Sequence, residues 1–78
     1  MKPVPVISGK ELVNALEKYD CIVVRTRGSH VRMRSSEGKM TSVPVHAGKT
    51  VPKGLLRKIL YKDLEFSEEQ VKQLFEML

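Results

Sequence analysis

The stretch RTRGSHVRMR at residues 25–34 combines a turn signal with an alternating strand pattern. Gly28-Ser29 suits a tight turn, because glycine adopts backbone angles that other residues rarely adopt. After the turn, polar and apolar residues alternate, as they do along a strand with one buried face. Val31 and Met33 would then point inward. The outward residues of this strand are expected to be His30, Arg32 and Arg34.

Two further strands are expected on either side of this stretch. Residues 21–25 are rich in β-branched side chains, and residues 40–46 again alternate. Ser36-Glu37-Gly38-Lys39 predicts the hairpin turn between the second and third strands. Pro44 cannot donate to a strand ladder, which predicts an edge position or a strand end. On the same alternation, the outward residues of the third strand are Ser42, Pro44 and His46.

Three helices are predicted around the strands. Ser8-Gly9-Lys10-Glu11 has the pattern of a capping box, and apolar residues then recur at helical spacing as far as residue 19. Pro52 suits the first turn of a second helix, and Gly54 within it suggests close backbone packing. Ser67-Glu68-Glu69-Gln70 is a second capping box, at the start of a third helix. The buried stripe expected for the second helix consists of Leu55, Leu56, Ile59 and Leu60.

The expected fold is therefore α+β in the order α-β-β-β-α-α, with helices on one face of a three-stranded antiparallel sheet. At 78 residues the chain is expected to form one domain, residues 1–78, with residues 1–7 as an extended lead-in. No apolar run approaches the roughly 20 residues of a membrane span, and the N-terminus lacks the apolar core of a signal peptide. With a single cysteine, no internal disulfide can form. A cytoplasmic protein with no membrane partner is the expectation.

Charge is concentrated in the middle of the chain. Residues 25–58 contain nine Lys or Arg against one acid, a net charge of +8, whereas residues 59–78 contain two lysines against five acids, a net charge of −3. A basic segment of this kind favours a polyanion such as nucleic acid. The alternative is a set of solvated strands that use charge to prevent edge-to-edge aggregation.

His30 is the strongest candidate for catalysis. Imidazole exchanges protons near neutral pH, and RNA supplies its own nucleophile in the 2′-hydroxyl. Arg32 and Arg34 on the same strand face could hold the scissile phosphate and stabilise charge on its oxygens. The opposing interpretation is an exposed strand histidine that has no role.

The other candidate residues are weaker. His46 could assist as an acid or bind phosphate, or be an ordinary surface histidine, and Ser29 could bind phosphate or serve only in the turn. Cys21 is expected to be a small buried hydrophobe, because it and the two histidines lack paired metal-ligand spacing. The loop after the third strand and the start of the second helix contain a basic cluster, which could be a second phosphate-contact patch or an ordinary solvated face. Its residues are Lys49, Lys53, Arg57 and Lys58. None of the aromatic residues lies in a predicted strand, so recognition of the RNA backbone and shape is expected rather than stacking on aromatic rings.

Several short motifs follow one another in a specific order and spacing. They are Ser8-Gly9-Lys10-Glu11, Gly28-Ser29-His30, Glu37-Gly38-Lys39, Val43-Pro44-Val45-His46 and the run from Pro52 to Leu60. With these motifs the chain resembles the HicA toxin family, also described as YcfA-like. The resemblance extends from about Ser8 to the C-terminus. The sequence departs from the family at Asp20-Cys21, where an aromatic residue is frequent, at Leu55, where threonine is common, and in the additional segment from Lys2 to Val6.

The resemblance implies a double-stranded-RNA-binding-domain-like fold and an mRNA interferase that blocks translation. The essential histidine of the family maps onto His30, which would act as general acid/base in a metal-independent endoribonuclease without a cofactor. The resemblance also implies a HicB-type antitoxin that masks this histidine. The residues expected to bind RNA are Arg25, Arg27, Ser29, Arg32, Arg34, His46, Lys49 and Lys53.

Two other functions fit the sequence. A small basic domain could hold RNA by shape and charge without cutting it, in which case binding would depend strongly on salt and replacement of His30 would carry no special penalty. A protein-interaction module could instead use the same basic face to bind an acidic partner.

Overall fold

The computed structural model describes residues 5–78. Its elements are α1 (Gly9–Lys18), β1 (Ile22–Arg27), β2 (His30–Arg34), β3 (Met40–Pro44), α2 (Lys53–Arg57), η1 (Lys58–Asp63) and α3 (Glu68–Glu76). The α-helical turns of α2 run directly into the π-helical turns of η1, so the two form one continuous helix. The order α-β-β-β-α-α and the α+β class are therefore confirmed, and both are consistent with a double-stranded-RNA-binding-domain-like fold.

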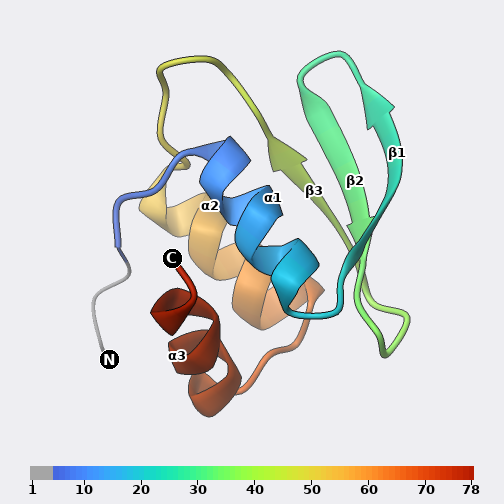
Figure 1. The fold of residues 1–78 in the computed structure, drawn as a ribbon, viewed down its shortest axis with the longest axis vertical. Coiled ribbons are helices and arrows are strands. Elements are labelled where there is room, and N and C mark those ends of the chain that lie inside the picture. Colours follow the sequence, from blue (N-terminus) through green and yellow to red (C-terminus); the bar gives the residue numbers. More distant parts are fainter. Residues whose placement is uncertain (1–4) are drawn as a thin grey trace.

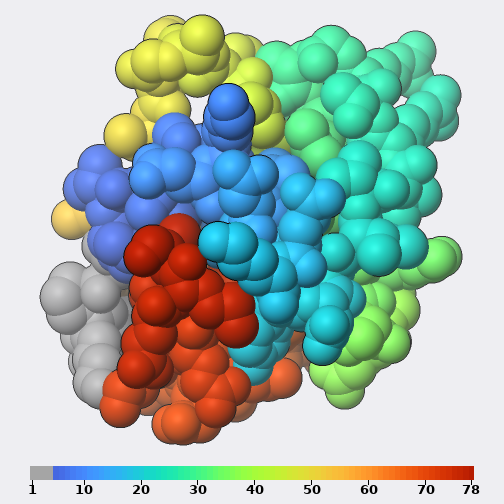
Figure 2. Space-filling view, viewed as in Figure 1, coloured from blue at the N-terminus to red at the C-terminus, as the bar shows by residue number. Residues whose placement is uncertain are grey.

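The three strands form one antiparallel sheet in the order β1-β2-β3 (Figure 1). The helices gather on one face of this sheet, and the other face is left open. Both capping boxes are formed: Ser8 exchanges hydrogen bonds with Glu11, and Ser67 does so with Gln70. Helices α1 and α3 pack side by side (Figure 2), and the Tyr19 hydroxyl donates to Gln73 Oε1 at 2.9 Å.

The core lies between the sheet and the helices. Met33 and Val43 are fully buried, as are Leu12 and Leu16 of α1 and most of the predicted stripe of the second helix. Thr41 is also buried; its hydroxyl donates to Asp63 Oδ2 at 3.0 Å and so ties β3 to η1. A buried hydroxyl with such a partner avoids most of the desolvation cost.

Some element ends differ from those predicted. The first strand continues to Arg27, beyond the predicted end at residue 25, and Cys21 lies just before it, buried in the core as expected. The third strand ends at Pro44 on the sheet edge, which confirms the prediction for this proline and leaves His46 outside the strand. Of the predicted lead-in, residues 1–4 lie outside the described residues. Ile7 is buried, and its carbonyl accepts from the Val51 N–H at 2.8 Å.

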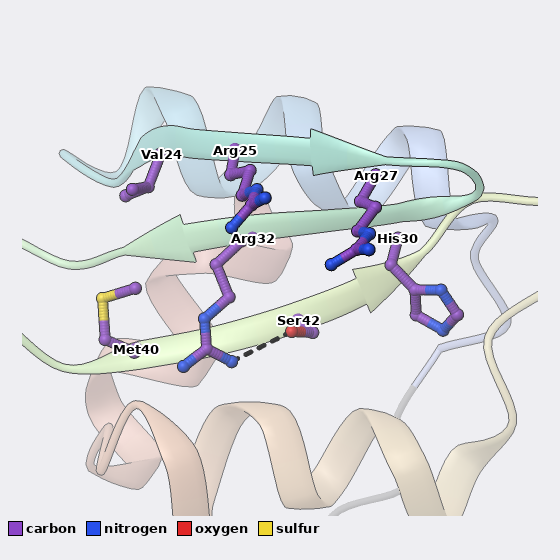
Figure 3. A pocket seen from close by; sticks show the side chains of 7 residues that line it. All are labelled: Val24, Arg25, Arg27, His30, Arg32, Met40 and Ser42. Carbon is purple, nitrogen blue, oxygen red and sulfur yellow. Dashed lines mark hydrogen bonds between the residues drawn. The ribbon is translucent and has the colours of Figure 1, made fainter.

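A β-bulge interrupts the pairing of β1 with β2. Val23 pairs with Met33 and Arg25 with Arg32, so Val24 is an additional residue on β1. A bulge places two residues opposite one on the partner strand and shifts the alternation of side chains by one position. If side chains simply alternated from Val24 onward, Arg25 and Arg27 would lie on the sheet face that the helices cover. Because of the bulge, both lie on the open face beside the outward residues of β2 (Figure 3).

The prediction of close backbone packing at Gly54 is wrong, because a Cβ at that position would meet no atom within 4 Å. The approach occurs instead at Gly9, the first residue of α1. A Cβ there would overlap the carbonyl oxygen of Pro44 and lie 3.0 Å from Cα of Val45. Gly9 therefore lets the start of α1 press against the end of β3.

Among residues 5–78, no helix combines the length and apolar character needed to cross a membrane.

Candidate functional site

The turn between β1 and β2 fixes the position of His30. Gly28 adopts a left-handed φ of 58°, and the carbonyl of Ser29 accepts from the Val45 N–H at 2.6 Å. His30 then begins β2 and pairs with Arg27 on one side and Pro44 on the other. Because the turn is hydrogen-bonded to the end of β3, the histidine projects from a backbone that is held at both neighbouring strands.

His30 lies at one end of a depression of about 390 Å³ on the open face of the sheet (Figure 3). The depression is lined by Val24, Arg25, Arg27, His30, Arg32, Met40 and Ser42. Arg32 Nη1 donates to Ser42 Oγ at 3.1 Å, which holds this guanidinium across the sheet. Three of the predicted RNA-binding arginines and the predicted catalytic histidine are therefore brought together.

The guanidinium groups of this depression are exposed, and the salt bridges of the described chain lie elsewhere. Among residues 5–78 these are Lys39 with Glu65 at 2.7 Å and Lys58 with Asp63 at 3.2 Å. Glu65 raises the pKa of Lys39 by hydrogen bonding and by its charge. The depression thus combines several positive charges with one histidine, an arrangement that attracts anions.

His46 belongs to a separate depression of about 260 Å³. Pro44 lines it together with Lys49, Thr50, Pro52 and Leu55. The Oγ atom of Ser29 lies 3.5 Å from His46 Nε2, at the long limit for a hydrogen bond. The two histidines were expected to share one face of the sheet. They line separate depressions instead, and the link between them is Pro44, which pairs with His30 and lines the depression that contains His46.

The remaining predicted contact residues lie outside both depressions. Arg34 pairs with Ile22 and Met40 at the far end of β2, and Lys53 is exposed at the start of α2. Lys58 is paired with Asp63, which favours an ordinary solvated role for this one lysine of the basic cluster.

Cys21 is buried, and burial together with the nearby Asp20 carboxylate raises the pKa of its thiol to about 11. Such a thiol stays protonated near neutral pH, which makes it a poor nucleophile and a poor metal ligand. Within the described residues, no group of three or more His, Cys, Asp or Glu side chains is placed to hold a metal ion.

Val24 and Met40 were not expected at the site. Met40 could have been found, because it alternates with Ser42 and so shares its face. Val24 could not, because the bulge that brings it there leaves no local signal in the sequence.

The fold and the site together define a small α+β protein whose open sheet face bears a histidine among arginines. A family model described as HicA toxin of bacterial toxin–antitoxin matches residues 9–66, and the chain belongs to this family. Membership identifies it as a toxin of a toxin–antitoxin system, in which the toxin is paired with an antitoxin. A search of curated proteins gave no match.

Proposed function

We propose that this toxin is a metal-independent endoribonuclease that cleaves mRNA and blocks translation, with His30 as general acid/base. The observation that carries the proposal is the position of His30 in one depression with Arg25, Arg27 and Arg32. Family membership supports it, because the Gly-Ser-His motif of the resemblance lies inside the matched residues.

In the proposed reaction, a ring nitrogen of His30 removes the proton of a 2′-hydroxyl, and the resulting oxygen attacks the adjacent phosphorus. The bond from phosphorus to the 5′-oxygen breaks, leaving a 2′,3′-cyclic phosphate on one fragment and a 5′-hydroxyl on the other. The departing oxygen receives its proton from the His30 imidazolium or from water. Arg25, Arg27 and Arg32 stabilise the negative charge that grows on the non-bridging oxygens.

RNA on either side of the scissile phosphate would follow the basic surface that surrounds the depression. Arg34 would contact the chain at one end, while Ser29 and His46 would do so at the other. Beyond them, Lys49 and Lys53 would bind further phosphates. In this proposal the protein acts in the cytoplasm as a single domain, and a HicB-type antitoxin inhibits it by covering His30.

The second candidate is an RNA-binding module that does not cut. One observation favours it: among the residues that line the depression, His30 is the single candidate for a general acid/base. Cleavage by a single such group requires water, or His46 from the neighbouring depression, to serve as its counterpart.

Expression without antitoxin distinguishes the two candidates. The wild type should arrest growth and produce RNA fragments that end in a 2′,3′-cyclic phosphate, identified by mass spectrometry, whereas His30→Ala should do neither. His46→Ala, which removes one proposed RNA contact in the neighbouring depression, should weaken the arrest far less than His30→Ala does. Arrest by His30→Ala at the wild-type level, with RNA left intact, would favour the binding module.

A further inference from the structure

One end of the His30 depression is apolar. Figure 3 shows Val24 of β1 and Met40 of β3 at the end opposite His30, on either side of β2, with Arg25 and Arg32 between this end and the histidine. Val24 is 47% exposed, a large fraction for an aliphatic strand residue. Binding of a phosphate requires only the arginines. The apolar end therefore indicates a ligand that has an apolar part as well as a negative charge.

The strand register gives the separation of the two ends. Along β3, Pro44 pairs with His30 and Met40 pairs with Arg34, four residues away. At a rise of about 3.3 Å per residue, this corresponds to roughly 13 Å along the sheet. One ligand can therefore place a phosphate beside His30 and still reach the apolar end only if it is extended, as a single-stranded oligonucleotide is.

A nucleobase fits the chemistry of the apolar end. Its faces are apolar and planar, and they pack against aliphatic side chains and stack on guanidinium planes. The Arg32 guanidinium is oriented by Ser42 Oγ, which uses an acceptor site of the hydroxyl and leaves its proton free to reach a base edge. A base in a duplex is paired and stacked, so it cannot present its face to a shallow depression on a sheet.

We propose that the end formed by Val24 and Met40 is a nucleobase subsite, which binds an unpaired base of the same strand roughly 13 Å along the sheet from the phosphate held at His30. This proposal rests on RNA as the ligand of the proposed function. It adds that the substrate is single-stranded at this point, and it replaces the aromatic ring of other single-strand binders with aliphatic side chains and guanidinium planes.

The test compares two oligonucleotides of equal length and charge. One is a short, fully 2′-O-methylated single strand, which cannot be cut by 2′-hydroxyl attack; the other carries a stable abasic sugar at every position. The wild type should bind the base-bearing strand about tenfold more tightly, at the lower end of what stacking contributes per base. The Val24→Ala/Met40→Ala double variant should lose this preference and bind both strands as the wild type binds the abasic one.

Val23→Ala is the matched control. Val23 is 40% exposed on the same strand, but it pairs with the buried Met33 and does not line the depression, so this variant should keep the tenfold preference. Equal affinity of the wild type for the two strands would overturn the subsite while leaving cleavage of natural RNA untouched. Loss of the preference in Val23→Ala as well would also overturn it. A base preference that disappears in the double variant, in a protein that leaves natural RNA uncut, would uphold the subsite and refute the proposed nuclease.

Discussion

Replacement of Gly9 by alanine tests how the start of α1 supports the end of the sheet. The added methyl group would overlap the Pro44 carbonyl oxygen and lie 3.0 Å from the carbonyl carbon. These are backbone atoms, so no side-chain rotation can relieve the contact. Either α1 or the end of β3 must move, and β3 at this point pairs with His30.

The expected cost combines two opposing contributions. Overpacking at a tight contact costs about 1–3 kcal/mol, and a rigid backbone neighbour places this site near the top of that range. Alanine restricts the unfolded chain and regains up to about 1 kcal/mol. We therefore expect Gly9→Ala to lower the free energy of unfolding by about 2 kcal/mol, which for a domain of this size lowers Tm by roughly 8–16 °C.

Urea and thermal unfolding followed by circular dichroism measure this change. The control is Gly54→Ala, which adds the same methyl group within a helix where nothing lies within 4 Å. It should be neutral or stabilising by up to about 1 kcal/mol, because alanine is the better helix former. A Gly9→Ala protein as stable as the Gly54→Ala protein would refute the contact between α1 and β3.

Three further perturbations test the site and the core. Arg27→Ala should make the negative slope of log K against log salt for RNA binding shallower by about 1, because one phosphate contact is lost. An unchanged slope would show that Arg27 does not contact a phosphate. Alkylation of Cys21 at pH 8.5 should be at least ~100-fold slower in the folded protein than in urea, because its pKa is about 11 when folded and about 8.5 when unfolded. As the folded state holds this proton more tightly, its stabilising contribution is complete below about pH 8.5 and disappears as the pH rises towards 11; equal alkylation rates would contradict the burial. Ser67→Ala should destabilise the protein by about 1 kcal/mol through loss of the α3 cap, and a change below ~0.3 kcal/mol would show that the cap hydrogen bond contributes little.

Much of the fold is encoded locally and was therefore predictable. The two capping boxes place the starts of α1 and α3, and the alternation from His30 to Arg34 places the buried and open faces of β2. Each of these signals depends on residues a few positions apart, so the sequence pattern contains it directly.

The features that escaped prediction depend on residues distant in the sequence. The bulge at Val24 is a property of the pairing of β1 with β2, and the tight approach at Gly9 depends on where β3 ends. The chain leaves the sheet after Pro44, so His46 lines a neighbouring depression instead of continuing the outward row of β3. The alternating sequence pattern continues past Pro44, so it cannot indicate where the pairing of β3 with β2 ends.

The central claim is that His30 performs proton transfer in RNA cleavage. The most direct test is the single-turnover rate of cleavage of a single-stranded RNA at saturating protein, measured for the wild type and for His30→Ala. Saturation removes any difference in binding, so the ratio of rates reports the chemical step alone. A general acid/base contributes typically 10²–10⁴-fold, so the variant should be slower by at least ~100-fold. A variant that cleaves within a few-fold of the wild-type rate would contradict the claim.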